Sequence, residues 1–251
     1  MKVKLIQKTQ NPVDVMWVAA RTCYSEKSPI ELWGDSATTP TDKKWKLVKA
    51  VLESGHQSIA EHVYFTFGIE GISRACSHQL VRHRAGIVFS QQSQRYVEIK
   101  ESQEELEKLF IESDYHKDYD NSELNNVLGK YFTENTFRNV NGYYYALDNY
   151  LEAIKNGEAA EDARRFLPNA TKTNITMSIN LRELIHICNS RLCTRAQKEI
   201  RDLFKSVKDE VVREFPELKE FLVPTCERDG FCSEHKSCGR KITKKEILKW
   251  Q

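Results

Sequence analysis

Two stretches of alternating apolar and polar residues, far apart in the chain, constrain the fold more than any other pattern. In residues 63–69, valine, phenylalanine and isoleucine occupy every second position, and residues 173–179 repeat this with threonine, isoleucine and methionine. A period of two predicts half-buried strands. The helical patterns around them do not alternate regularly with strands, so we predict an α+β fold with a mixed or antiparallel sheet and flanking helices.

Helices are predicted where apolar residues recur at helical spacing. Asn11 followed by Pro12 is typical of a helix start, and a helix beginning near Asp42 is expected to stop at Gly55. Further helices are predicted over residues 72–80, 126–156, 159–166 and 181–189, and a last long helix ends near residue 215.

Several boundaries follow from capping and turn residues. Asn180 with Glu183 forms a capping signature for the helix at 181–189, and Thr194 with Gln197 repeats it. Gly71 is expected to end the first alternating strand. Residues 25–41 are expected to be a loop, and residues 96–99 to form another strand.

Length and charge limit the classes of protein that are possible. The 251 residues are 40% hydrophobic and support a sizeable core, so we expect one domain over 1–251 with a cysteine-containing tail at 216–251. The 38 basic and 36 acidic residues nearly cancel, which gives no general attraction to nucleic acid or membranes. The N-terminal apolar run is too short for a signal peptide or a membrane span, so we expect a cytoplasmic protein.

The seven cysteines are odd in number and spread along the chain, which favours reduced thiols over a disulfide scaffold. Cys226, Cys232, Cys238 and His235 lie together in the tail and offer the ligand types of a zinc site. Their five-residue gaps lack the short cysteine pair that such sites use. No metal site is therefore predicted.

The densest group of hydrogen-bonding side chains lies in residues 82–96. It contains Arg82, Arg84 and Arg95 with several glutamine and serine residues, and no acid lies between Glu70 and Glu98. Guanidinium groups without nearby counter-charges favour a phosphate or carboxylate ligand. The alternative is that these arginines pair with surface carboxylates from elsewhere in the chain.

A second polar group surrounds residues 182–195. Arg182, His186 and Asn189 are spaced to share one helical face, and Arg191 follows at the break before the next helix. These side chains could line a pocket. The alternative is a cationic helix end that complements the helix dipole.

Motifs for other chemistries are missing from the sequence. We find no glycine-rich phosphate loop, no dinucleotide fingerprint and no convincing protein nucleophile with its base. A site of arginines, amides and hydroxyls favours an enzyme whose difficult chemistry is carried by a cofactor.

Arg82-His83-Arg84 followed by Ser93-Gln94-Arg95-Tyr96 resembles the signature of the flavin-dependent thymidylate synthases, the ThyX family. The resemblance continues in the same order over most of the chain. It covers residues 19–21, 55–62, Gln79, 163–168 and 180–197.

This resemblance implies a ThyX-like fold and a homotetramer with active sites at subunit junctions. The implied reaction is the reductive methylation of dUMP to dTMP, with FAD as cofactor, methylenetetrahydrofolate as carbon donor and NADPH as reductant. No enzymic cysteine nucleophile is needed for such a reaction, in agreement with the missing nucleophile. Ser93 is accordingly predicted to hydrogen-bond the substrate and not to attack it.

The resemblance also assigns residues. Arg191 matches the catalytic arginine that favours ionisation of the uracil N3. The positions implied for dUMP are Gln79, Arg82, Gln91, Gln92, Ser93, Gln94, Arg95, Arg164 and Arg191, with Arg95 and Arg164 on the phosphate. The positions implied for FAD are His56, Ser58, Arg82, His83, Arg84, Gln91, Asn180, Arg182 and His186.

Two other functions remain open from the sequence. A single-stranded nucleic acid binder could use the arginine window with Tyr96, although the near-zero net charge counts against it. A flavoprotein acting on another nucleotide would share the cofactor and differ only in substrate.

Overall fold

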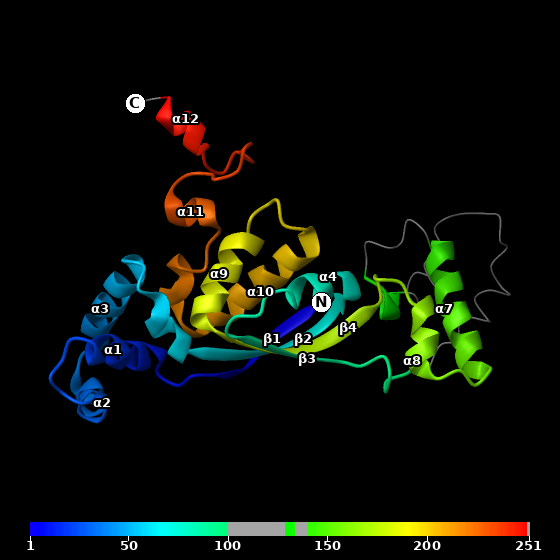
Figure 1. Ribbon diagram of the computed structural model, residues 1–251, viewed down its shortest axis with the longest axis horizontal. Coiled ribbons are helices and arrows are strands. Elements are labelled where there is room, and N and C mark those ends of the chain that lie inside the picture. Colours follow the sequence, from blue (N-terminus) through cyan, green and yellow to red (C-terminus); the bar gives the residue numbers. More distant parts are fainter. Residues whose placement is uncertain (100–128, 134–139, 250–251) are drawn as a thin grey trace. The chain divides into compact units, whose positions relative to one another are not determined.

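A computed structural model describes residues 1–99, 129–133 and 140–249 (Figure 1). The chain forms two compact units. Unit 1 contains Met1, residues 70–80 and residues 90–175, and unit 2 contains residues 2–69, 81–89 and 176–251. Each unit is described by itself below.

Four strands form one antiparallel sheet in the order β1-β2-β4-β3. They are β1 (Lys2–Lys8), β2 (Tyr64–Ser73), β3 (Ile87–Gln91) and β4 (Lys172–Asn180). β2 and β4 contain the two alternating stretches, and the side chains of Phe65 and Phe67 are fully buried. The predicted α+β class with an antiparallel sheet and flanking helices is confirmed.

Two strand predictions were wrong in their limits. β2 does not end at Gly71 but continues to Ser73. Glycine accommodates the φ of 71° at this position, and its N–H donates to Asn174 Oδ1 at 3.1 Å. Residues 96–99 form no strand. The strand lies earlier, at Ile87–Gln91, in the apolar part of the arginine window.

The first half of unit 2 contains α1 (Pro12–Thr22), α2 (Pro29–Thr38), α3 (Thr41–Glu53) and the 3-10 helix η1 (Gln57–His62). α1 contacts both α2 and α3, and Figure 1 shows these three helices as one group. The predicted helix starts after Asn11 and near Asp42 are confirmed. Gly55 follows α3 with a φ of 89°, as expected for a helix stop.

The helix α2 corrects the expected loop at residues 25–41. Ser28 Oγ accepts from the N–H of Glu31 at 3.3 Å, and Glu31 Oε2 accepts from the N–H of Ser28 at 2.8 Å. Pro29 occupies the first turn. A capping box with proline in the first turn is a helix start, and this signal outweighs the two prolines and the glycine of the segment.

The second half of unit 2 contains α9 (Leu181–Arg191), α10 (Lys198–Glu214), η4 (Pro216–Glu220), α11 (Thr225–Asp229) and α12 (Lys244–Leu248). α10 packs on β1, where the N–H of Leu5 donates to Glu210 Oε2 at 2.9 Å. α9 is capped by Asn180 as predicted. α10 is capped by Gln197 and not by Thr194, because the Gln197 side chain accepts from the N–H of Ile200.

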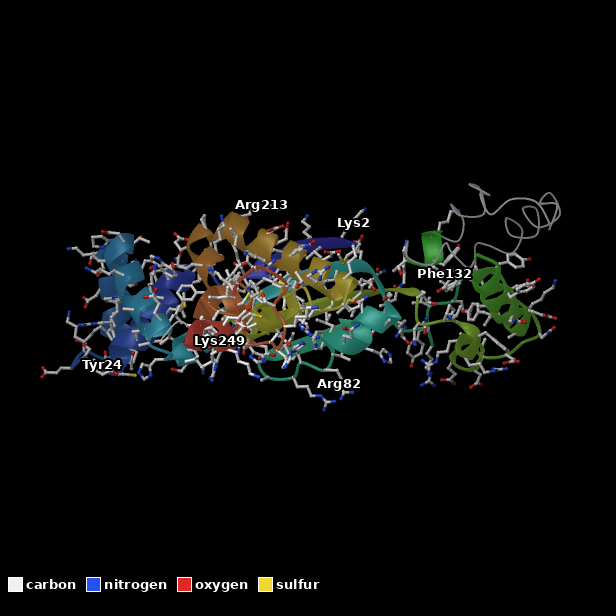
Figure 2. All side chains as sticks on the ribbon, turned by 90° about the horizontal axis from the view of Figure 1, so that it is seen from above. Lys2, Tyr24, Arg82, Phe132, Arg213 and Lys249 are labelled. Carbon is white, nitrogen blue, oxygen red and sulfur yellow. The ribbon has the colours of Figure 1, made fainter. Side chains whose placement is uncertain are left out.

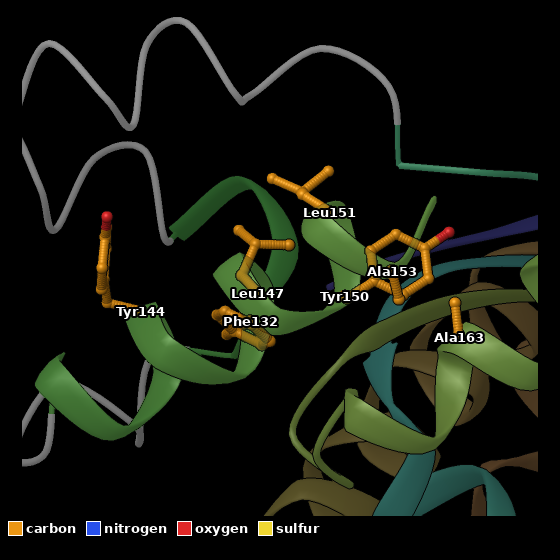
Figure 3. Packing of buried hydrophobic residues seen from close by; sticks show 7 residues of the cluster. All are labelled: Phe132, Tyr144, Leu147, Tyr150, Leu151, Ala153 and Ala163. Atoms are coloured by element: carbon orange, nitrogen blue, oxygen red, sulfur yellow. The ribbon is translucent and has the colours of Figure 1, made fainter. Parts of the chain in front are cut away.

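Unit 1 contains α4 (Arg74–Leu80), α7 (Val140–Lys155), α8 (Ala160–Ala163) and η3 (Arg164–Phe166). Its apolar core joins side chains of α7 to Phe132 and Ala163 (Figure 3). Tyr144, Leu147 and Tyr150 are buried there, which confirms that the aromatic stripe of this helix belongs to a core. Of the predicted helix at 126–156, residues 126–128 and 134–139 lie outside the described residues, as does the segment 100–128.

No helix in the described part of the chain is both long enough and apolar enough to cross a membrane.

Candidate active site

The residues predicted to bind dUMP fall mainly in unit 1. Gln79 lies in α4, Gln91 is the last residue of β3, and residues 92–95 form the turn that follows it. Arg164 begins η3 in the same unit. Arg82 and Arg191, which are also predicted for dUMP, belong to unit 2.

A pocket of about 400 Å³ in unit 1 is lined by three of these residues. Gln92, Ser93 and Gln94 contribute polar groups, and Tyr150 and Leu167 contribute an apolar wall. A largely apolar cavity with a few converging polar groups is typical of a small-molecule site. The pocket therefore places the predicted nucleotide-binding segment where a ligand can reach it.

Hydrogen bonds to β4 fix the start of this segment. Asn174 Nδ2 donates to Gln92 Oε1 at 2.8 Å, and the N–H of Gln92 donates to the Asn174 carbonyl at 2.9 Å. Gln91 Nε2 donates to Ser77 Oγ at 3.2 Å and to Thr173 Oγ1 at 3.1 Å. The side-chain amide nitrogen of Gln91 is thus held by two hydroxyl groups of the protein.

Arg95 is held by an acid that the sequence did not suggest. Its Nε forms an ion pair with Glu161 Oε2 at 2.8 Å, and Arg164 Nε donates to the Glu161 backbone carbonyl at 2.9 Å. Arg95 also stacks on the Tyr96 ring, 5.4 Å from its centroid. In the structure without ligands, Arg95 thus pairs with a carboxylate from elsewhere in the chain, as the alternative interpretation of the arginine window describes.

Arg74, in the wall of the same pocket, was missed by sequence reasoning. Its Nη2 donates to the Gln92 carbonyl at 3.2 Å, and its Nε is buried without a hydrogen-bond partner among the described residues. Burial and the neighbouring charge of Arg164 lower the pKa of Arg74. The signal that could have found it is the acid-free stretch after Glu70, which includes Arg74 as well as the window at 82–96.

In unit 2, the predicted catalytic arginine is the end of a chain of polar contacts. Arg191 Nε donates to His83 Nε2 at 3.1 Å, and His83 Nδ1 lies 3.6 Å from Glu183 Oε1. The side chains of His83 and Glu183 are only 12% and 11% exposed. Sequence reasoning identified Glu183 only as part of the capping signature of α9, and its contact with His83 was missed.

The protonation of this chain follows from its surroundings. Burial, reinforced by the charges of Arg191 and His186, lowers the pKa of His83 to about 4, and burial raises the pKa of Glu183. His83 is therefore neutral near pH 7. Because its Nε2 accepts from Arg191, we assign the ring proton to Nδ1, on the side of Glu183.

Gly86 brings the arginine window next to the start of α9. The N–H of Asn180 donates to the Gly86 carbonyl at 2.8 Å, and the Asn180 side chain accepts from the N–H of Glu183 at 2.8 Å. A Cβ on Gly86 would lie 2.1 Å from Asn180 Nδ2, and the glycine has a φ of 62°. Only glycine suits both the backbone and the close approach.

The remaining residues predicted for the flavin lie at the surface of unit 2. These exposed residues are His56, Ser58, Arg82, Arg84, Arg182 and His186. Arg82 projects away from the ribbon in Figure 2. Arg182 pairs with Glu61, whereas no ion pair or hydrogen bond joins the guanidinium of Arg82 or Arg84 to a described residue.

Arg182, His186 and Asn189 lie four and three residues apart in α9, the spacing of one helical face, but they differ in burial. Asn189 is buried, whereas the other two are exposed. The C-terminal tail covers this position, because Thr225 Oγ1 donates to the Asn189 carbonyl at 3.1 Å. Of the second polar group, Arg182 and His186 therefore lie at the surface, whereas Asn189 lies under the C-terminal tail.

The tail docks beside the turn between α9 and α10. Arg195 pairs with Glu234 at 3.5 Å and donates to the Lys236 carbonyl at 2.9 Å. All seven cysteines lie in the described residues, and none of them forms a disulfide bond. Within the ranges that the structure describes, no three histidine, cysteine, aspartate or glutamate side chains are grouped as ligands of one metal ion.

Sequence comparison identifies the class to which this fold and these residues belong. Residues 4–217 match the family model described as thymidylate synthase complementing protein. A flavin-dependent thymidylate synthase from Clostridium tetani is 38% identical, with 98% of this chain and 96% of that protein covered. Another, from Pyrococcus furiosus, is 35% identical, with 100% of this chain and 97% of that protein covered.

A solved structure agrees with the sequence relatives. Flavin-dependent thymidylate synthase ThyX from Helicobacter pylori, complexed with FAD and dUMP, has a TM-score of 0.67 at 25% identity, with 89% of this chain and 100% of that chain covered. The chain described here belongs to the family of flavin-dependent thymidylate synthases. The sequence-based resemblance is therefore confirmed.

Proposed function

We propose that this protein converts dUMP to dTMP by reductive methylation, with methylenetetrahydrofolate as the carbon donor and NADPH as the reductant that acts through FAD. Family membership over nearly the whole chain supports the reaction type. The observation that carries the proposal is the oriented arginine Arg191, held by neutral His83 in unit 2.

Arg191 is proposed to favour the ionised uracil. Its Nε is occupied by His83, which leaves its terminal N–H groups to donate to a substrate oxygen or nitrogen. A guanidinium stays charged near neutral pH, so it stabilises negative charge on the ring without losing its own proton. Fixing the donor before the substrate binds reduces the reorganisation needed for the reaction.

The dUMP molecule is proposed to be bound by Gln79, Arg82, residues 91–95, Arg164 and Arg191. The amide and hydroxyl groups of Gln92, Ser93 and Gln94 line the unit 1 pocket and can form hydrogen bonds to a nucleotide. Ser93 Oγ already accepts from the N–H of Arg95 at 3.0 Å, which favours a positioning role for this hydroxyl. Arg95 and Arg164 are proposed to contact the phosphate.

The residues proposed for FAD are His56, Ser58, Arg82, His83, Arg84, Gln91, Asn180, Arg182 and His186. They fit a flavin dinucleotide, because Arg82 and Arg84 have no partners among the described residues and can donate to a diphosphate. Because Gly86 has no Cβ, its backbone can lie close to the side chain of Asn180, one of these residues. When bound, FAD supplies the hydride for the reduction.

The assembly and location are proposed from the family resemblance. We propose a cytoplasmic homotetramer that uses small-molecule substrates and has no nucleic-acid or membrane partner. Its active sites are proposed to lie at subunit junctions. The single domain over 1–251 and the separate tail at 216–251 stay predictions.

Growth of a thymidine-requiring strain carrying this chain tests the function. The expected result is growth without thymidine for the natural sequence and none for Arg191→Ala produced at the same level. Conversion of dUMP to dTMP by the purified yellow protein, with NADPH and methylenetetrahydrofolate, provides the direct measurement. Soluble yellow protein that neither rescues growth nor forms dTMP would contradict the proposal.

A further inference from the structure

Arg74 is a charged residue in the unit 1 pocket without an assigned role. It begins α4 and lines the same cavity as Gln92, Ser93 and Gln94. The inference below rests on the proposed function, because it concerns how the dUMP phosphate is held.

The guanidinium of Arg74 is incompletely satisfied. One terminal nitrogen donates to the Gln92 carbonyl at 3.2 Å, whereas the buried Nε has no acceptor among the described residues. A buried N–H without an acceptor is unfavourable, and more so on a charged group. An acceptor supplied by a ligand would remove this cost.

The charges around Arg74 favour an anion. Burial and, to a smaller extent, the charge of Arg164 lower the pKa of Arg74. No described carboxylate forms an ion pair with the guanidinium of Arg74 or Arg164. The pocket wall also contains Lys172, which donates to the Gly129 carbonyl, and one acid, Glu98. Two like charges close together become favourable when a dianion neutralises both.

Arg95 differs from these two arginines because it already has a counter-ion. Its ion pair with Glu161 at 2.8 Å must be exchanged before it can bind a phosphate. Arg164 uses only its Nε, on a backbone carbonyl, so its terminal groups need no such exchange. Without a ligand, Arg74 and Arg164 are therefore the better prepared pair.

We propose that Arg74 binds the phosphate of dUMP together with Arg164 and that it makes the site select the nucleotide over the nucleoside. Its backbone acceptor, the Gln92 carbonyl, belongs to the segment proposed to bind dUMP. The same contact therefore orients Arg74 and connects it to residues 92–94.

Equilibrium binding to Arg74→Gln tests this role in the full-length flavin-loaded protein. We expect affinity for dUMP to fall by about tenfold to a hundredfold, the range for losing one charge-assisted hydrogen bond, with deoxyuridine affinity unchanged. Competition by inorganic phosphate should weaken in parallel. Arg165→Gln is the matched control, because Arg165 is paired with Glu158 at 2.6 Å and should not affect either ligand.

A loss that is equal for dUMP and deoxyuridine, or no loss for dUMP, would overturn the role of Arg74. If Arg74→Gln does not fold, judged by circular dichroism, Arg74→Lys gives the same readout, with an intermediate loss for dUMP alone. Failure of the proposed function looks different. The natural protein would then bind inorganic phosphate in an Arg74-dependent way and would neither bind dUMP in preference to other nucleotides nor form dTMP.

Discussion

Arg191 in unit 2 and Arg74 in unit 1 are both partly buried arginines, but their neighbours differ. Arg191 donates to a neutral histidine that is itself backed by a carboxylate. Arg74 has one backbone acceptor, an unpartnered Nε within the described residues, and another guanidinium nearby. The first arrangement fixes a donor before the ligand arrives, and the second leaves positive charge for a ligand to neutralise.

This difference predicts that Arg191 orients the substrate for reaction, whereas Arg74 contributes to its binding affinity. A donor that is held in place by the protein acts mainly on the transition state, so its removal lowers kcat. A cation that lacks a counter-ion gains most from the ligand in its ground state, so its removal raises KM or Kd. The predictions below test this distinction, from the largest expected effect to the smallest.

Replacing Arg191 by alanine should lower kcat by about 100- to 1,000-fold, as expected for the loss of one positioned donor to a developing negative charge. KM for dUMP should change only severalfold. Steady-state kinetics of dTMP formation measure both constants. Arg213→Ala serves as control, because Arg213 is an exposed partner of Glu210 on α10. An effect confined to KM would show that Arg191 binds and does not orient.

Replacing Gly86 by alanine should reduce the free energy of unfolding by roughly 1–3 kcal/mol, because a residue with a Cβ is strained at the φ of 62° and would meet the Asn180 side chain. Urea unfolding measures the change. The matched control is Gly34→Ala in α2, which has open space and should stabilise by up to about 1 kcal/mol. Equal changes in both variants would exclude a special role for Gly86.

Acid should destabilise the fold through His83. Its pKa is about 4 in the folded protein and near 6.5 in the unfolded chain, so between these values the unfolded chain binds more protons. This contribution is fully present above pH 6.5 and is lost as the pH falls towards 4, with a slope of at most about 1.4 kcal/mol per pH unit. Urea unfolding from pH 7 to 4 should show a smaller slope for His83→Gln. If the pH dependence of the free energy of unfolding were the same in His83→Gln, a group other than His83 would be responsible for it.

Replacing Glu161 by glutamine should lower KM for dUMP by about two- to fivefold, because a partly exposed ion pair with Arg95 is worth only about 0.2–1 kcal/mol. Glu158→Gln, which releases Arg165 instead, is the control and should leave KM unchanged. A higher KM in Glu161→Gln would mean that this acid positions Arg95 for the phosphate and does not compete with it.

Local patterns predicted the two central strands, β2 and β4, and most helices. The alternation in β2 and β4 and the Asn180 cap of α9 depend on neighbouring residues, and each was found where expected. α2 was missed although Ser28 and Glu31 form its capping box, because two prolines and the lack of an apolar period suggested a loop. β3 was missed because its short apolar run lies inside the polar window.

The contacts of the candidate site depend on residues that are distant in the sequence. Glu161 beside Arg95, and Glu183 beside His83, follow no spacing rule, since each pair is joined only by the folded chain. Arg74 was within reach of sequence reasoning, because it shares the acid-free stretch with the arginine window. What the sequence lacked was evidence that its side chain lines the same pocket as residues 92–94.

Each unit is built from separate stretches of the sequence, and this affects how the chain can fold during synthesis. Unit 2 combines residues near the N-terminus with residues after 175, and its first strand is bonded to Glu210. A ribosome adding about 5–20 residues per second must therefore deliver most of the protein before β1 meets its partner helix. Until then the apolar faces of the early strands are uncovered, so incomplete products are natural substrates for chaperones and proteases.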